Sequence, residues 1–296
     1  MRDWKGKVAV ITGAGSGMGA AMARRFAGEG MKIVVADIDL AAAESTAADI
    51  VAGGGEAIAL RADVASQDAV QAMADQAWAH FGAVHVLVNN AGIVPSGRYR
   101  PIWDFPLEDW QWSFDVNLMG VVHGIRAFIP RMIAEGVDGH VVTTASIAGL
   151  ISGSGSPVYS ASKHAAVRAT EALYASLQEI GSPIGVTLLC PGLVNTNIYR
   201  SERNRPQALL PEQGAAAETP ELQAIADNLY RSAISPEAVA DMVFDAMERR
   251  QFYLLTSDNY DGSIRERADA MMERRNPQFE SLLALSKVDI DDKAAG

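Results

Sequence analysis

The stretch that decides the fold is Val8-Ala-Val-Ile-Thr12 followed by Gly13-Ala-Gly-Ser-Gly17-Met-Gly19. The apolar run predicts a buried strand of a parallel sheet. Residues 20–29, directly behind the glycines, predict a helix. A strand, a glycine loop and a helix in this order are typical of a dinucleotide site. The loop lets a diphosphate approach the backbone, and the helix N-terminus offers free N–H groups.

The same alternation continues along the whole chain. Further apolar runs predict strands at 32–37, 57–61, 84–88, 140–144, 185–190 and 252–256. Helical patterns fill the intervals at 40–52, 67–81, 107–133, 158–179 and 236–249, with two more expected at 264–275 and 279–285. Strands alternating with helices predict the α/β class. We expect one Rossmann-like, doubly wound domain over residues 1–296, with a seven-stranded parallel sheet flanked by helices.

A carboxylate ends the second predicted strand. Asp37 lies about twenty residues beyond the glycines, which suits the 2′-hydroxyl of an adenosine ribose and repels a 2′-phosphate. Neither Ser16 nor Ile38, close to the same spot, supplies a base that offsets this repulsion. NAD is therefore expected in preference to NADP. Asp37 also fits as the N-cap of the next helix, although Asp39 is better placed for that role.

Tyr159 and Lys163 stand four residues apart in a predicted helix, so their side chains share one face. A nearby cation lowers the pKa of a phenol, so Tyr159 is expected to act as an acid/base near neutral pH. Such a group suits the interconversion of an alcohol and a ketone, in which a proton moves at oxygen while hydride moves at carbon. Ser146, just past the fifth predicted strand, is a candidate donor to the same oxygen. Taken alone, the pair also fits an ordinary helix surface.

Together these residues resemble the short-chain dehydrogenase/reductase family. The matching motifs, which span roughly residues 6–256, are Thr12-Gly-x-x-x-Gly17-x-Gly19, Asp63-Val64, Asn89-Asn-Ala-Gly92, Asn117, Ser146, Tyr159-x-x-x-Lys163 and Pro191-Gly-x-Val194-x-Thr196. The glycine spacing is that of the standard branch. The C-terminal tail with Phe252-Tyr-Leu-Leu-Thr256 resembles that of bacterial aryl-alcohol dehydrogenases that act on lignin-derived compounds.

The resemblance implies an NAD-dependent oxidoreductase that interconverts a secondary alcohol and a ketone. It implies catalysis by Asn117, Ser146, Tyr159 and Lys163, with Asn117 holding a water that links Lys163 to solvent. The residues implied to bind the cofactor are Gly13, Ser16, Gly17, Met18, Gly19, Asp37, Asp63, Val64, Asn90, Ala91, Gly92, Tyr159, Lys163, Pro191, Gly192, Val194 and Thr196. A homodimer or homotetramer, formed through the helices that carry Asn117 and Tyr159, is also implied.

The chain is longer than typical members of that family. The surplus lies in residues 199–220, an irregular segment expected to act as a substrate lid, and in a C-terminal extension at 257–296. The residues expected to line the substrate pocket are Val94, Ile147, Leu150, Leu193, Ile198, Tyr199, Leu209 and Leu210. Because they are mostly apolar, we expect a bulky hydrophobic or aromatic secondary alcohol. Trp110, Trp112 and Phe114 are interpreted as packing residues.

Composition excludes several other classes of protein. The net charge of −11 argues against nucleic acid or an anionic membrane as a partner. No apolar run reaches the length of a membrane span. The single cysteine, Cys190, and five histidines without ligand spacing leave no metal site expected. Cys190 is interpreted as a buried strand residue, and the cytoplasm is the expected location.

Two other functions stay open at this point. A 3-oxoacyl-thioester reductase would commonly use NADPH, which Asp37 disfavours. A non-catalytic dinucleotide sensor could use the same fold, because fold alone does not determine function.

Overall fold

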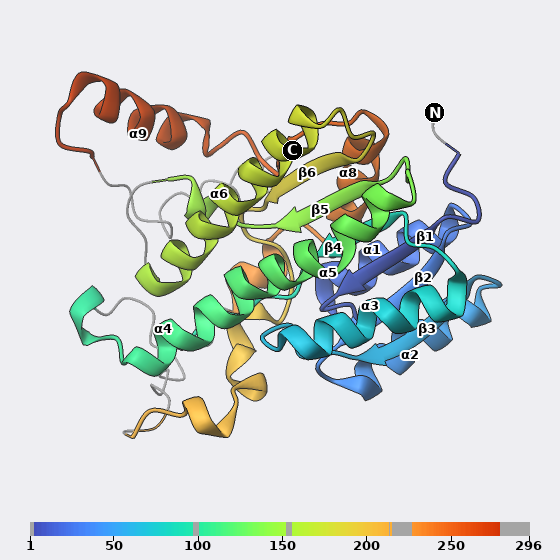
Figure 1. Cartoon of the computed structure of the whole chain (residues 1–296). Coiled ribbons are helices and arrows are strands. Elements are labelled where there is room, and N and C mark those ends of the chain that lie inside the picture. Colours follow the sequence, from blue (N-terminus) through green and yellow to red (C-terminus); the bar gives the residue numbers. More distant parts are fainter. Residues whose placement is uncertain (1–2, 97–100, 152–155, 213, 215–226, 279–296) are drawn as a thin grey trace.

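The computed structural model describes residues 3–96, 101–151, 156–212, 214 and 227–278. Its seven strands form one parallel sheet in the order β3-β2-β1-β4-β5-β6-β7 (Figure 1). The strands are β1 (Val8–Thr12), β2 (Lys32–Asp37), β3 (Glu56–Arg61), β4 (Val86–Asn89), β5 (His140–Thr144), β6 (Gly185–Cys190) and β7 (Tyr253–Leu255). The strand order reverses between β1 and β4, which is where ligands bind in such sheets. The predicted doubly wound α/β domain is confirmed.

Helices cover both faces of the sheet. They are α1 (Gly17–Gly28), α2 (Leu40–Ala52), α3 (Gln67–Phe81), α4 (Leu107–Phe114), α5 (Gly120–Ala134), α6 (Pro157–Glu179), α8 (Pro236–Glu248) and α9 (Asp261–Glu273). Helices α1, α2 and α8 pack on one face, and α3, α5 and α6 on the other (Figure 1). Strand β1 contributes side chains to the hydrophobic cores on both faces of the sheet. Ala9 and Ile11 point to the first face, and Val8 and Val10 point to the second. This is the two-residue alternation of a strand buried on both sides.

Short polar side chains act as N-caps at the start of three of the helices. The carboxylate of Asp39 accepts a hydrogen bond from the N–H of Ala42 at the start of α2. Ser66 accepts likewise at α3, and Ser235 does so at α8 just before Pro236. Each of these contacts satisfies a backbone donor that the first turn leaves without a partner. The predicted caps are confirmed, and Asp39 rather than Asp37 caps α2.

The long helix predicted at 107–133 is interrupted. A π-helical turn at Asp115–Met119 separates α4 from α5, and Asn117 lies within it with no exposed surface. An inserted π turn re-aims side chains on one side of a helix. Here it directs the Asn117 amide towards the backbone of Ile93, which the apolar periodicity of the sequence does not reveal.

Other boundaries differ from the predictions by one to three residues, mainly because strand and helix ends fray. Strand β4 begins at Val86 rather than 84, and α9 runs from Asp261 to Glu273 rather than 264 to 275. The segment predicted as irregular contains short 3-10 helices at Ile198–Asn204 and Gln207–Leu209. The helix predicted at 279–285 and most of 213–226 lie outside the described residues. No helix in the described part of the chain has the length and apolarity to cross a bilayer.

Candidate functional site

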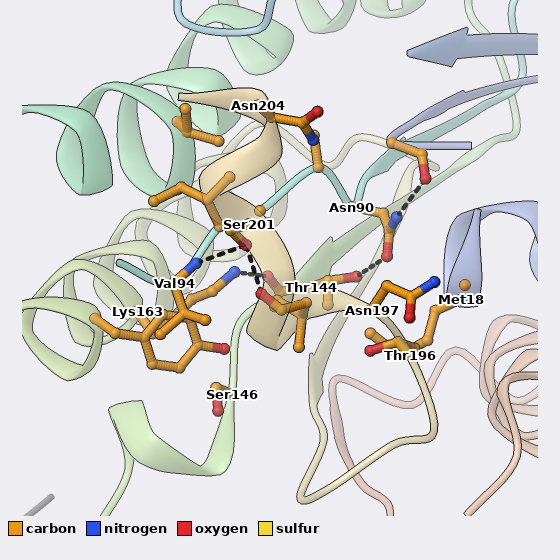
Figure 2. A pocket seen from close by; sticks show the side chains of 18 of the residues that line it. Met18, Asn90, Val94, Thr144, Ser146, Lys163, Thr196, Asn197, Ser201 and Asn204 are labelled. Carbon is orange, nitrogen blue, oxygen red and sulfur yellow. Dashed lines mark hydrogen bonds between the residues drawn. The ribbon is translucent and has the colours of Figure 1, made fainter. Parts of the chain in front are cut away.

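A pocket lies at the carboxyl ends of the strands, where the sheet order reverses (Figure 2). Most of the predicted site residues line it: Gly13, Ser16, Gly17, Met18, Asp37, Asp63, Val64, Asn90, Ala91, Gly92, Ser146, Tyr159, Lys163, Pro191, Gly192, Val194 and Thr196. Gly19 and Asn117 are the exceptions, because both lie behind the pocket wall. The structure therefore brings together motifs that are spread over almost two hundred residues of sequence, roughly the span from Gly13 to Thr196.

The glycines of the first loop have distinct structural roles. Gly13 and Gly17 adopt φ values of +64° and +52°, a region that residues with a side chain rarely enter. Gly19 is needed for a different reason: a Cβ there would lie 2.2 Å from the carbonyl oxygen of Gly13. Its missing side chain lets α1 pack directly against the loop, although it does not face the pocket.

The carboxylate of Asp37 is held in place by the glycine loop. Its Oδ2 accepts a hydrogen bond from the N–H of Gly15 at 2.9 Å, and its Oδ1 accepts from the N–H of Asp39 at 3.0 Å. A Cβ on Gly15 would lie 3.0 Å from that same carboxylate oxygen. The carboxylate is thus fixed at the end of β2, where it lines the pocket.

Hydrogen bonds of the Thr12 and Asn90 side chains connect the carboxyl ends of three neighbouring strands, β1, β4 and β5. The Thr12 hydroxyl donates to the carbonyl of Val88 and accepts from the N–H groups of Asn90 and Ala91, at 3.0–3.2 Å. The Asn90 amide donates to the carbonyl of Thr12 at 3.0 Å and accepts from the hydroxyl of Thr144 at 3.2 Å (Figure 2). Because its side chain is engaged in these bonds, Asn90 contributes a rigid wall to the pocket.

Helix α6 brings Tyr159 and Lys163 to the opposite end of the pocket from Asp37, beside Ser146. The Tyr159 side chain lies beside Ser146 in the pocket lining, and the Ser146 hydroxyl favours the charged form of the phenol. The Lys163 ammonium lies 5.7 Å from the centre of the Tyr159 ring and donates to the carbonyl of Thr144 at 2.9 Å. Lys163 is only 2% exposed, so the pair does not lie on an ordinary helix surface. A buried ammonium needs a specific partner, and the carbonyl of Thr144 provides it.

The pKa of Tyr159 departs from the sequence-based expectation. Burial raises the pKa of the Tyr159 phenol well above its ordinary value, and the Ser146 side chain offsets this only in part. Burial also lowers the pKa of Lys163 to about 8. Both shifts have the same cause, because the loss of contact with water disfavours the charged form of either group. The predicted depression of the Tyr159 pKa by Lys163 is therefore wrong for this arrangement of the two side chains.

Asn117 does not line the pocket but holds together two of the segments that form its wall beside Tyr159. Its amide forms paired hydrogen bonds with the backbone of Ile93, both at 2.9 Å, and donates to the hydroxyl of Ser162 at 2.9 Å. Ser162 lies between Tyr159 and Lys163 on α6. Asn117 therefore joins the loop after β4 to the helix that carries the proton-transfer pair.

Several lining residues were not anticipated from the sequence. They are Trp112, Asp115, Val116, Ser156, Asn197, Ser201, Arg203, Asn204, Pro206, Tyr230 and Tyr260. Trp112, interpreted from the sequence as a packing residue, is 1% exposed and also faces the pocket. Tyr260 is equally buried and packs on Gly192, where a Cβ would lie 2.7 Å from its ring. No local motif marks Tyr260, because it comes from the start of α9, far along the chain.

The expected substrate residues divide into two groups. Val94, Ile147, Leu193, Ile198 and Leu209 line the pocket. The other three do not: Leu150 packs below it, Tyr199 stacks on Tyr230 with ring centres 4.7 Å apart, and Leu210 is 41% exposed. The apolar character of the wall is thus retained with partly different residues.

A buried ion cluster anchors residues 198–209 over the pocket. The guanidinium of Arg205 donates to Asp109 and to Glu202, each at 2.6 Å, and to the carbonyl of Leu209 at 3.0 Å. The same group lies 4.3 Å from the centre of the Trp112 ring. The side chains of Arg205 and Asp109 are each 3% exposed. The described half of the expected lid is therefore attached to α4 by an ion pair shielded from water.

The site and the fold have known counterparts. A family model described as short chain dehydrogenase matches residues 7–207. A CLA biosynthesis dehydrogenase/reductase of Lactiplantibacillus plantarum is 36% identical over 270 residues, which cover 90% of this chain and 93% of the relative. A C alpha-dehydrogenase of Sphingobium sp. is 32% identical over 257 residues, covering 86% of this chain and 82% of the relative.

A crystal structure of a short chain dehydrogenase/reductase from Burkholderia phymatum, in complex with NAD, superposes with a TM-score of 0.86. It is 43% identical and covers 95% of this chain and 99% of that chain. The Sphingobium relative agrees with the expected resemblance to bacterial aryl-alcohol dehydrogenases. With its matching motifs, fold and relatives, the chain belongs to the short-chain dehydrogenase/reductase family.

Proposed function

We propose that the protein is an NAD-dependent dehydrogenase that interconverts a secondary alcohol and a ketone, with a bulky hydrophobic or aromatic substrate. One observation carries the proposal. The Tyr159 side chain, with Ser146 beside it and the Lys163 ammonium 5.7 Å from its ring centre, shares one pocket with a glycine loop and a fixed carboxylate at Asp37. Relatives named as dehydrogenases support this reaction class.

The pocket suits NAD at its β1–β2 end. The glycine loop, with Gly13 and Gly17 at positive φ, would offer its backbone and the start of α1 to a diphosphate, and the rigid carboxylate of Asp37 suits a ribose with two free hydroxyls. A 2′-phosphate would have to approach a carboxylate that the N–H groups of Gly15 and Asp39 keep in place. The NAD complex of the Burkholderia relative supports the same choice.

NAD, when bound, supplies the acceptor or donor of hydride, and the chain supplies the proton chemistry. Ser146 and Tyr159 both direct hydroxyl groups to the position of a substrate oxygen. With its raised pKa, Tyr159 is protonated at neutral pH, which is the form that donates a proton to a ketone oxygen. Lys163 places a cation behind the ring, and Asn117 fixes α6 through Ser162.

The substrate class follows from the side chains beyond Tyr159. Trp112, Tyr230, Tyr260, Ile147 and Leu209 present aromatic and aliphatic surface to the pocket. Apolar walls with a few polar groups favour a bulky hydrophobic ligand whose reacting oxygen is oriented by hydrogen bonds. We propose that residues 199–220 form the lid over this substrate and that the C-terminal extension contributes Tyr260.

The test is a panel of aryl and aliphatic secondary alcohols and ketones, with turnover followed by absorbance of the reduced nicotinamide. We expect NAD-linked turnover by the wild type and its loss, by about 10²-fold or more, in Tyr159→Phe with NAD affinity retained. Tyr199→Phe is the matched control, since Tyr199 does not line the pocket. NAD binding without turnover across the panel would instead support a dinucleotide sensor. Higher efficiency with NADPH would support the thioester-reductase alternative.

A further inference from the structure

The anchored segment 198–209 carries a second arginine with very different surroundings. Arg203 lines the pocket, whereas Arg205 is buried among carboxylates. The Nη1 group of Arg203 donates to the carbonyls of Asn197 at 3.0 Å and Arg200 at 2.7 Å. In the part of the chain that the structure describes, no carboxylate pairs with this guanidinium.

The orientation of Arg203 leaves donors available. A guanidinium has five N–H groups in a planar fork. The two carbonyls engage Nη1, and no acceptor among the described residues takes the hydrogens on Nε and Nη2. That edge of the fork matches two oxygens of a phosphate group. The two backbone acceptors hold the side chain in place before any ligand arrives, which reduces the ordering cost of binding.

The position of Arg203 points to a specific part of the pocket. Its anchor, Asn197, follows Thr196, and Thr196 touches the glycine loop so closely that a Cβ on Gly17 would lie 3.1 Å from its methyl group. Figure 2 shows Thr196 and Asn197 together with Met18 among the side chains that surround this pocket. The guanidinium is therefore attached next to the loop that is expected to hold the diphosphate.

Charge balance supports the same ligand. The carboxylates that line the pocket are Asp37, Asp63 and Asp115, and its basic lining residues among those described are Lys163 and Arg203. Lys163 is engaged with the carbonyl of Thr144 beside Tyr159. In a chain of net charge −11, a local cation would favour a diphosphate with two negative charges, and Arg203 is attached near the glycine loop.

We propose that Arg203 binds the diphosphate of the dinucleotide from the lid side, opposite the glycine loop. The inference rests on the proposed NAD-dependent function. Segment 198–209 would then connect the cofactor part of the pocket to its substrate part. Arg203 would bind the diphosphate, and the ion cluster around Arg205 fixes the same segment over Trp112 in the substrate wall. Cofactor binding would thereby add a contact to the segment that shapes the substrate pocket.

The experiment is calorimetric titration of NAD and of adenosine into the wild type and three variants. Arg203→Gln is expected to raise the Kd for NAD by roughly tenfold, since it removes charge-assisted hydrogen bonds at a partly exposed site. Arg203→Lys keeps the charge without the fork and should fall in between. Arg200→Gln, which removes the same charge from the same segment, should leave the Kd for NAD within about twofold of the wild type. Adenosine, which lacks the diphosphate, should bind all four proteins equally.

The possible results separate this inference from the proposed function. NAD binding and turnover by the wild type, together with an unchanged Kd for NAD in Arg203→Gln, would overturn the assignment of Arg203 alone. An unchanged Kd for NAD with a raised KM for a carboxylate-bearing substrate would also overturn it and move Arg203 to the substrate. Absence of NAD binding in the wild type would overturn both proposals together.

Discussion

Replacing Arg205 tests whether the buried ion cluster holds the described part of the lid closed. Arg205→Met removes the guanidinium but keeps a side chain of similar length. Asp109, whose side chain is 3% exposed, would then be buried without its cation. Breaking a buried pair in this way costs about 3–5 kcal/mol. The loss of the hydrogen bond to Leu209 and of the contact with the Trp112 ring adds to the same effect.

The loss should appear locally, at the contacts that the described part of the lid makes with the loop after β4. Two amides report on it directly: the N–H of Val94 donates to the Ser201 hydroxyl at 3.1 Å, and the N–H of Ser96 donates to Glu202 at 2.8 Å. If local opening becomes easier by 3–5 kcal/mol, hydrogen exchange at these amides should accelerate by about 10²–10⁴-fold. Hydrogen exchange followed by NMR measures both amides individually.

Two further variants make this experiment decisive. In Asp109→Asn/Arg205→Met the buried carboxylate is neutral, so part of the lost protection should return. Arg24→Met breaks an ion pair with Asp49 whose side chains are 48% and 56% exposed, and should change no amide of the lid. The opposite result is that the hydrogen-exchange rates of the Val94 and Ser96 amides in Arg205→Met stay within about threefold of the wild-type rates. That result would refute the idea that the cluster closes the lid.

Three further predictions concern the rest of the site. Asp37→Asn should raise the efficiency of NADP relative to NAD by about tenfold or more, measured as the ratio of the two kcat/KM values, because it removes the charge that repels a 2′-phosphate. Gly19→Ala should weaken NAD binding severely, measured by calorimetry, because its Cβ would collide with the carbonyl of Gly13 at 2.2 Å. Lys163→Met should alter how stability depends on pH, measured by urea unfolding. The pKa of Lys163 is lowered from 10.5 to about 8, so between these values the unfolded chain binds more protons than the native protein. The free energy of unfolding of the wild type should therefore rise with pH across this interval relative to Lys163→Met, and an equal slope for both proteins would contradict the shift.

The parts of the site that the sequence reveals are those encoded by local patterns. The glycines after β1, Asp37 at the end of β2 and Asn90 after β4 each sit beside an apolar run that marks a strand. A parallel sheet brings all these strand ends to one edge, so the topology follows once the strands are recognised. Tyr159 and Lys163 could be placed on one face of α6 for a similarly local reason.

The ion cluster and the aromatic wall could not be predicted in this way. Arg205 meets Asp109 across 96 positions of sequence, and no periodic signal connects them. Tyr260 reaches the pocket because it packs on Gly192, a contact set by how β7 and α9 return to the sheet. Leu210 was expected in the pocket because it is apolar, yet the 3-10 turn at Gln207–Leu209 leaves it exposed. These positions depend on tertiary packing rather than on local preference.

The direction of the Tyr159 pKa shift could not be predicted from the spacing of Tyr159 and Lys163 alone. Four-residue spacing brings a cation to within 5.7 Å of the ring, but it does not determine where the ammonium is directed. The carbonyl of Thr144 binds the ammonium, and burial raises the pKa of the phenol more than the Ser146 side chain lowers it. Desolvation therefore prevails, and the phenol stays protonated.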